Sequence, residues 1–532
     1  MTPNRNNLIE ELLSRIQPSK RRRLEIAAEM EENKVFALSH GMNERWLAAE
    51  PNAAPPFDGW QSYDRTPWLH PWMTSDNIRH FARFSTRVIE KLRTPRAEPK
   101  LAFVSNLANY NYTRMHALKS RGYRSSLHLH PLDNYPMSLP AWEEFDGDVG
   151  AGSLDDFAAS GLPPVDDVHR ADLDLLWSNS SLGERAPFLR PADVLRYMEF
   201  MPYLPTLSAL QDFDVLCGAD AAWLAYLAGK PYASVLTGGE IWFLAARADA
   251  LGRLQRATLR NASAILVSNP ISLAHARRLG LTNLVYLPWF LDETRYSPGE
   301  AEFRPEWVKR SGGDFFVFSS ARIDDLWKGS SVGIQGFAKF AASDSGARLV
   351  VTSWGKNIPE ATAYFRDIGI AERVLFLPAS GKRRLIAYLR SADCMIEQFR
   401  LGYYGGSALE ALACGLPVIM RLERAQYDAL NHTGAPPVLE AATADEVASQ
   451  LAALRRDTSR QAEIRARSRL WFLENHSAAR WADPFIKMVA GIARGWHVPD
   501  RRSPLKTPLT AAEQDYHDRQ LRDAPPFPEY LI

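Results

Sequence analysis

The chain has 532 residues, of which 46% are hydrophobic, and its 63 Lys and Arg against 62 Asp and Glu give a formal net charge of +1. Single cores stop growing at roughly 250–300 residues, so this length predicts two or more domains. Binding to DNA or to an anionic membrane needs many positive charges gathered on one face. The even charge balance therefore excludes nucleic acid as a first hypothesis.

The cysteines and the N-terminus indicate the compartment. Cys217, Cys394 and Cys414 are too far apart for a CxxC metal site or a disulfide framework, which favours a reducing compartment. The N-terminus lacks the apolar core of a secretory signal, and no run of about 18 uncharged apolar residues occurs. We expect a cytoplasmic protein with at most peripheral membrane contact.

The first 98 residues predict a mainly helical extension. Its basic run at 20–23 is typical of a solvated helix face. Residues 51–74 are rich in Pro and Trp and favour an ordered loop, because Pro interrupts helices and central strands. Ser75 then offers an N-cap for a helix that ends before Pro95.

From Lys100 onward, short apolar runs alternate with stretches of helical character. Strand, helix and strand in close succession indicate a parallel sheet with crossover helices. We expect a Rossmann-like domain over 99–295, with an insertion around 131–200 that is rich in Asp and Pro. Its predicted strands are 101–104, 126–129, 215–217, 233–236 and 264–267.

A second alternation of the same kind predicts another Rossmann-like domain over 296–480. It is followed by a C-terminal helix and a polar, Pro-rich tail over 481–532. Two consecutive doubly wound domains bind ligands in the cleft where their strand ends face each other. The predicted strands are 315–318, 349–351, 374–377, 394–396 and 418–420.

Two cations follow the first strand of the second domain. Arg322 follows it, and Lys328-Gly329 stands six residues later at the expected start of a helix. A strand end, two cations and a helix N-terminus together suit a diphosphate, because the helix amides and the positive side chains point at the same place. The alternative is a pair of surface cations beside a turn glycine.

A glycine-rich segment precedes another helix of that domain. Gly405 and Gly406 let the backbone come close to a ligand, and the helix begins near Ser407. Glu410 then lies close to the first turn, where it could accept hydrogen bonds from the vicinal hydroxyls of a sugar. The alternative is a helix with a favourable acidic residue near its start.

These motifs resemble those of the retaining GT-B glycosyltransferases, most closely glycosyltransferase family 4. The family's Glu-Ala-Met-Ala-Cys-Gly-x-Pro-Val string stands here at 410–418 with Leu412 in the Met position. Residues 261–268 are similar to the segment that opens the last strand of the family's N-terminal domain. Residues 287–298 are similar to its interdomain hinge. The resemblance extends over about 100–490.

The resemblance implies a GT-B fold, two Rossmann-like domains facing a cleft, and transfer of a sugar from a nucleotide sugar. It implies that Arg322 and Lys328 bind the diphosphate of a UDP- or GDP-linked donor and stabilise the leaving group. It implies no resident cofactor and no essential metal. The donor-binding residues that it indicates are Glu410, Gly405, Gly406, Ser407, Glu397, Gln398 and Gly329.

On the acceptor side, Thr237-Gly238-Gly239-Glu240 stands where the family has a loop that faces the cleft. The resemblance gives Glu240 a catalytic place beside the transferred sugar, although a charged turn residue is equally consistent with the pattern. The acceptor-side residues that it indicates are Asn109, Tyr112, His130, Gly238 and Gly239. A carbohydrate, a lipid-linked saccharide, a protein or a small molecule could supply the acceptor hydroxyl.

One position departs from the family pattern. The family commonly has a first Glu eight residues before the second, and Gly402 stands there in this chain. The nearest acid is Glu397, followed by Gln398, which implies a rearranged set of contacts to the sugar hydroxyls. Two other functions share such a fold: a nucleotide-sugar epimerase or phosphorylase, and an inactive nucleotide-binding scaffold whose extension docks to a partner.

Overall fold

The computed structural model describes residues 75–129, 139–148, 166–170, 204–242, 245, 250–323, 325, 328–353 and 358–498. The chain divides into two compact units, 1–58 and 59–532, and every described residue lies in the second unit. The predictions for residues 1–74, for His130 and for the tail beyond 498 lie outside the described residues. In the described part, no helix is both long and apolar enough to cross a membrane.

The first sheet confirms the N-terminal alternation of strands and helices. Within the described residues it has seven parallel strands in the order β3-β2-β1-β4-β5-β6-β7. The strands are β1 (Leu101–Val104), β2 (Ser126–Leu129), β3 (Val168–Arg170), β4 (Val215–Gly218), β5 (Tyr232–Val235), β6 (Ala264–Val267) and β7 (Leu284–Tyr286). The stretch predicted as an insertion supplies the edge strand β3, and the other edge strand, β7, was not predicted.

The second sheet is also built from parallel strands that alternate with helices. Its described strands are also parallel and have the order β10-β9-β8-β11-β12-β13. They are β8 (Phe315–Ser319), β9 (Ala347–Thr352), β10 (Val374–Leu377), β11 (Cys394–Ile396), β12 (Val418–Met420) and β13 (Leu439–Glu440). Two doubly wound parallel sheets are the fold class that the sequence predicted.

Burial on both faces explains why these strands are continuous apolar runs. Alternate residues of a strand point to opposite faces. In β1, Ala102 and Val104 belong to one hydrophobic cluster, while Leu101 and Phe103 belong to another. Helices cover both faces, so neither set of side chains meets water.

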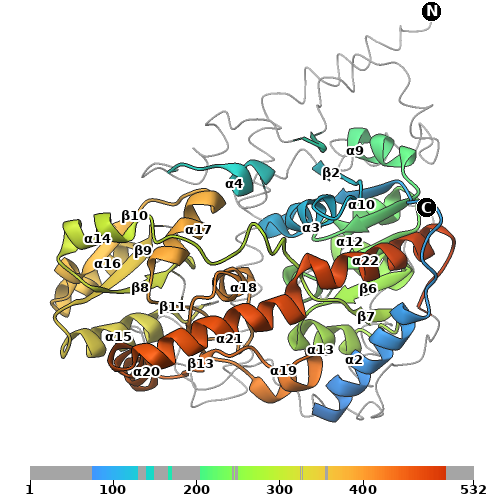
Figure 1. The fold of residues 1–532 in the computed structure, drawn as a ribbon. Coiled ribbons are helices and arrows are strands. Elements are labelled where there is room, and N and C mark those ends of the chain that lie inside the picture. Colours follow the sequence, from blue (N-terminus) through green and yellow to red (C-terminus); the bar gives the residue numbers. More distant parts are fainter. Residues whose placement is uncertain are drawn as a thin grey trace, which may run out of the picture. The chain divides into compact units, whose positions relative to one another are not determined.

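Two helices connect parts of the chain that are far apart in sequence. Helix α2 (Ser75–Glu90) packs on β7 and on α19 (Arg424–Leu430), and the Ser85 hydroxyl accepts a hydrogen bond from the Tyr286 amide at 2.7 Å. Helix α22 (Ala478–Ala493) packs against β4 and β5 of the first sheet. Figure 1 shows α22, in red, in the half of the picture that holds this sheet. It directly follows α21 (Thr458–His476), which contacts α18 (Gly406–Ala413) of the second sheet's domain. The chain therefore returns to the first sheet at residue 477.

Helix α15 (Ser330–Ala341) packs against α20 (Ala444–Arg456). A Cβ added at Gly336 would lie 2.9 Å from the Ala444 carbonyl oxygen and would overlap the Cβ of Val447. Because a Cβ is fixed to the backbone, no rotamer change relieves that overlap. Gly336 therefore sets the distance between the two helices.

We predict that Gly336→Ala destabilises the protein. Its gain in helix propensity is about 1 kcal/mol, whereas overpacking costs roughly 1–3 kcal/mol, so a net loss is expected. Urea unfolding at an unchanged m-value measures it. Lys339→Ala, an exposed change on the same helix, is the control and should stay within about 0.5 kcal/mol of wild type. A variant more stable than wild type would show that the helices separate without cost.

Candidate active site at the strand ends of the second sheet

The loop after β8 places the two predicted phosphate-binding cations. Gly329 is the N-cap of α15 and has φ 63°, in the left-handed region, and a Cβ there would lie 3.2 Å from the Arg400 amide nitrogen. Both facts require glycine at this position. Lys328 thus stands directly before the N-terminus of a twelve-residue helix, where backbone amides favour an anion.

Lys328 joins this loop to the end of β11. Its ammonium group donates a hydrogen bond to Glu397 Oε1 at 2.7 Å, and its carbonyl accepts one from the Phe399 amide at 2.7 Å. The Glu397 side chain is fully buried, whereas that of Lys328 is 21% exposed. The structure therefore brings together two of the predicted site residues, with the lysine accessible and the carboxylate beneath it.

The loop between β11 and α18 has an open N-terminal turn. A Cβ added at Gly405 would meet no atom within 4 Å, and Gly405, Gly406 and Ser407 are all partly exposed. Gly406 lies under the ring of Trp289, which a side chain there would displace. Gln398 instead turns toward its own loop, where its side-chain oxygen accepts hydrogen bonds from the amides of Arg400 and Leu401 at 3.0 and 3.3 Å.

Glu410 has a partner that the sequence did not predict. Lys382, the first residue of α17 (Lys382–Ser391), donates to Glu410 Oε1 at 2.5 Å, and both side chains are at least nine-tenths buried. Burial raises the pKa of Glu410, while Lys382 acts to lower it. The basic run that begins at Lys382 stands at a strand end and a helix start, as Lys328 does, and this signal could have identified it.

The charges of Arg322 and Glu240 both act on the pKa of Tyr403. Burial raises the pKa of Tyr403, the carboxylates of Glu397 and Glu240 act in the same direction, and the Arg322 guanidinium opposes them. Charged residues from the loops of both sheets therefore act on the pKa of one phenol. Tyr403 itself was not predicted as a site residue.

The Glu240 carboxylate caps its own turn. It accepts hydrogen bonds from the amides of Thr237, at 2.5 Å, and Gly238, at 2.9 Å, and from the Thr237 hydroxyl at 2.6 Å. Only 4% of the residue is exposed, and this burial raises its pKa against the effect of those hydrogen bonds. Gly238 has φ 145°, and a Cβ at Gly239 would meet open space. This geometry matches the reading of Glu240 as a turn residue, and its catalytic place stays a prediction.

The loop after β1 is held in an unusual backbone conformation. Ser105, Ala108 and Asn109 have φ values of 60°, 52° and 57°, a region that non-glycine residues seldom adopt. The Asn109 side-chain amide donates to the Leu139 carbonyl at 3.1 Å, and the Tyr112 hydroxyl donates to Glu144 Oε1 at 2.7 Å. These two of the predicted acceptor-side residues thus contact the segment 139–144.

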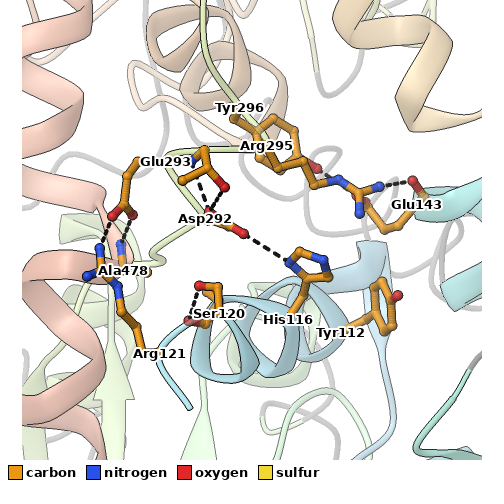
Figure 2. Close-up of polar contacts among 12 residues, drawn as sticks. Tyr112, His116, Ser120, Arg121, Glu143, Asp292, Glu293, Arg295, Tyr296 and Ala478 are labelled. Atoms are coloured by element: carbon orange, nitrogen blue, oxygen red, sulfur yellow. Dashed lines mark hydrogen bonds and ion pairs between the residues drawn. The ribbon is translucent and has the colours of Figure 1, made fainter. Parts of the chain in front are cut away.

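The passage from the first sheet to the second is fixed by charged side chains on both sides (Figure 2). Asp292 faces His116 of α3 (Tyr110–Lys119) at 3.4 Å and also accepts hydrogen bonds from Thr294. Burial acts to raise the pKa of Asp292, but these hydrogen bonds outweigh it and hold the pKa below its usual range. Glu293 accepts a hydrogen bond from the Ala478 amide at 2.9 Å and so caps α22.

A buried imidazole connects this passage to the return passage. His476 Nδ1 lies 2.6 Å from the Trp289 carbonyl oxygen, and Nε2 lies 2.9 Å from the Tyr404 hydroxyl. A carbonyl can only accept, so Nδ1 carries the proton and Nε2 accepts from Tyr404. Burial lowers the pKa of His476 to about 4. The neutral imidazole is therefore the form that the fold requires.

Comparison with known proteins bears on the family and the fold. The Glycosyl transferases group 1 family matches residues 301–471, which confirms the resemblance to glycosyltransferases over that part of the chain. A D-inositol 3-phosphate glycosyltransferase from Nocardia farcinica is 28% identical over 229 residues, 40% of this chain and 50% of that protein. A D-inositol 3-phosphate glycosyltransferase from Mycobacteroides abscessus is 37% identical over 79 residues, 14% of this chain and 18% of that protein. The chain thus spans about half the length, or less, of these curated relatives.

Solved structures share the fold. HepE from Anabaena, in complex with UDP and glucose, has a TM-score of 0.51 and 15% identity, covering 74% of this chain and 99% of that chain. The N-terminal domain of Candida albicans trehalose-6-phosphate phosphatase has a TM-score of 0.50 and 15% identity, covering 76% and 99%. At these identities the likeness shows the fold alone, and that fold is the predicted GT-B arrangement of two parallel sheets.

We predict that Lys382→Met destabilises the protein by about 3–5 kcal/mol, because it leaves the buried Glu410 carboxylate without a cation. The double variant Lys382→Met/Glu410→Gln should recover more than half of that loss, as measured by urea unfolding. Lys339→Met, from the exposed pair of Lys339 with Asp445, is the control and should cost less than about 1 kcal/mol. Equal losses of stability in Lys382→Met and Lys339→Met would contradict the assignment of Lys382 and Glu410 as a buried ion pair.

We also predict a pH dependence that is due to His476. Its pKa is about 4 in the folded chain and about 6.5 when unfolded, so only the unfolded state binds the proton between these values. Stability should be unaffected above pH 6.5 and fall by about 3 kcal/mol as the pH drops to 4. His476→Gln should remove the His476 part of this slope in chemical unfolding, while His128, whose pKa burial also lowers to about 4, keeps its own part. The exposed His432→Gln is the control that should keep the wild-type slope.

Proposed function

Because residues 301–471 are a Glycosyl transferases group 1 domain, we propose that the chain is a hexosyltransferase that moves a sugar from a nucleotide sugar to an acceptor hydroxyl. The observation that carries the proposal is the meeting of two strand-end loops. Lys328, before the N-terminus of α15, is bound to Glu397 at 2.7 Å, beside the open N-terminal turn of α18. Helix N-termini and a cation are the groups that bind a diphosphate.

The proposed mechanism is electrostatic. Arg322, Lys328 and the amides of Gly405 and Gly406 stabilise the negative charge that develops on the departing diphosphate. The acceptor hydroxyl attacks from the face that the diphosphate leaves, and a diphosphate oxygen accepts its proton, so that the anomeric configuration is retained. The cations supply the counter-charge that a metal would otherwise provide, and we propose that the reaction is independent of metal.

The proposal also includes the donor, the acceptor and the compartment. UDP sugars are the first donors to test, because HepE binds UDP and glucose in a structure of the same fold. A phosphorylated polyol is the first acceptor to test, because the curated relatives are D-inositol 3-phosphate glycosyltransferases. We place the protein in the cytoplasm, and its three buried free thiols are as expected of a reducing compartment.

We predict that one nucleotide family raises the unfolding temperature and that Lys328→Ala abolishes the rise. The unfolding temperature is measured with UDP, GDP, ADP, dTDP and their glucose conjugates. A ligand at 100 times its Kd stabilises the folded protein by about 2.7 kcal/mol, which gives a measurable rise. Sugar transfer by Lys328→Ala, measured with EDTA present, should fall roughly 100-fold or more. Lys339→Ala, exposed on the same helix, is the control.

Three results would contradict the proposal. A folded Lys328→Ala variant that keeps most of the turnover would remove Lys328 from the site. Loss of transfer by the wild type in EDTA would overturn the metal-independent mechanism. Nucleotide binding without transfer to any acceptor would instead indicate a scaffold protein.

A further inference from the structure

An acidic segment of the first sheet's domain lies on the second domain. Residues 139–148 stand between β2 and β3 in the sequence and include the short helix α4 (Pro140–Glu144). Helix α4 nevertheless packs on α17, which follows β10 of the second sheet. Four carboxylates lie within six residues of this segment, at Glu143, Glu144, Asp146 and Asp148.

These carboxylates meet the basic start of α17. Arg383 lies 2.9 Å from Glu144 Oε2, while Arg384 lies 2.9 Å from Asp148 Oδ1 and 3.6 Å from Asp146 Oδ1. Most of these side chains are partly exposed, so each pair contributes only about 0–1 kcal/mol. These outer pairs are complementary in charge and individually weak, whereas the buried contacts of Arg295 with Glu143 and Glu144 hold the segment more firmly.

Backbone contacts define the register of the segment on this surface. Asp148 forms an antiparallel bridge with Ser380, whose hydroxyl donates to Asp148 Oδ1 at 2.8 Å. The Gly381 amide donates to the Gly147 carbonyl at 3.0 Å. The apolar part of the contact is small, because Leu139 and Trp142 are the buried residues of the segment in a cluster with Ala379.

The same segment reaches the neighbourhood of Glu410. Its Gly147 carbonyl accepts a hydrogen bond from Gly381, the residue directly before Lys382, and Glu143 accepts one from the Tyr296 hydroxyl at 2.6 Å. Within the described residues, Glu143 Oε1 and Glu410 Oε2 are buried and have no hydrogen-bond partner. The charge of Glu143 contributes to raising the pKa of Glu410, and Lys382 and Arg295 offset part of this repulsion.

We propose that residues 139–148 are an acidic strap that occupies the Glu410 end of the donor site as an internal competitor of the nucleotide sugar. This rests on the proposed function. Glu410 is 2% exposed and bound to Lys382, and the strap is hydrogen-bonded to the residue before that lysine, so we expect ribose hydroxyls to reach Glu410 only after the strap has moved. If the closed form is favoured tenfold, the apparent Kd is about tenfold weaker than that of the open form.

A reversible cross-link tests the strap directly. In Asp148→Cys/Ser380→Cys the new thiols face each other, and bridge partners in antiparallel strands have Cα atoms about 4.5–5.5 Å apart, within disulfide range. The three native cysteines are buried, which keeps them from competing. UDP-, GDP-, ADP- and dTDP-glucose are each titrated against the oxidised and the reduced protein. We expect binding at least 100-fold weaker when oxidised, with recovery on reduction.

A second variant opens the strap instead of locking it. Asp146→Asn/Asp148→Asn removes both ion pairs with Arg384 and should strengthen binding of the same probes about 3- to 10-fold. Asp445→Asn, which removes an exposed carboxylate paired with Lys339, is the matched control and should leave binding unchanged. The single Asp148→Cys variant under the same oxidant controls for oxidation.

The outcomes separate the inference from the proposed function. Equal binding by the oxidised and reduced forms would overturn the strap and leave the transferase proposal standing. Weaker binding by the Asn variant would make the segment part of the binding surface, which also overturns the strap. If neither form, nor the wild type, binds any of the four probes, the proposed function and the strap fall together.

Discussion

The two passages of the chain between its sheets are hydrogen-bonded to each other, and the position of the site depends on that pairing. The Leu291 amide donates to the His476 carbonyl at 2.9 Å, and the Ala478 amide donates to the Leu291 carbonyl at 2.9 Å. The two connections between the sheets are therefore hydrogen-bonded to each other at Leu291. We call this point the pivot, because it positions the loops after β5 and β11 relative to each other. Tyr403 can therefore have Glu240 from one domain and Arg322 from the other as electrostatic neighbours. His476, neutral and buried, stabilises the pivot through Trp289 and Tyr404.

The cations of the site are neutralised from within the protein. Lys328 is paired with Glu397, Lys382 with Glu410 and Arg295 with Glu144. Burial acts to raise the pKa of Glu144, yet Arg295 and the hydrogen bond from Tyr112 lower it to about 2, so it carries a full negative charge at neutral pH. A half-buried cation needs a counter-charge, and a carboxylate and a phosphate oxygen meet the same need. Under the proposed function, an anionic ligand enters by exchange and replaces an internal carboxylate.

Much of the fold could be predicted from the sequence, because strands buried on both faces are continuous apolar runs that need no tertiary information. The strands that were missed are short and lie at sheet edges, and β3, Val-His-Arg, has no apolar run at all. The loops with Lys328 and Gly405 could be predicted because strand ends and helix N-termini dictate where they lie. The pairing of Lys382 with Glu410 could not, because the two residues are 28 positions apart and no periodicity relates them. The strap lies in a stretch whose composition indicates only an insertion.

The departure from the family pattern at Gly402 involves more than the loss of one carboxylate. Gly402 has φ 67°, which side chains other than glycine seldom tolerate, and a Cβ there would lie 2.7 Å from Glu423 Cγ. The Glu423 amide also donates to the Gly402 carbonyl at 2.8 Å, so the loops after β11 and β12 are joined at this point. A glutamate restored at 402 would have to change the backbone and displace Glu423 at once. The two positions therefore form a single structural unit, and the acid of that unit comes from the neighbouring strand end.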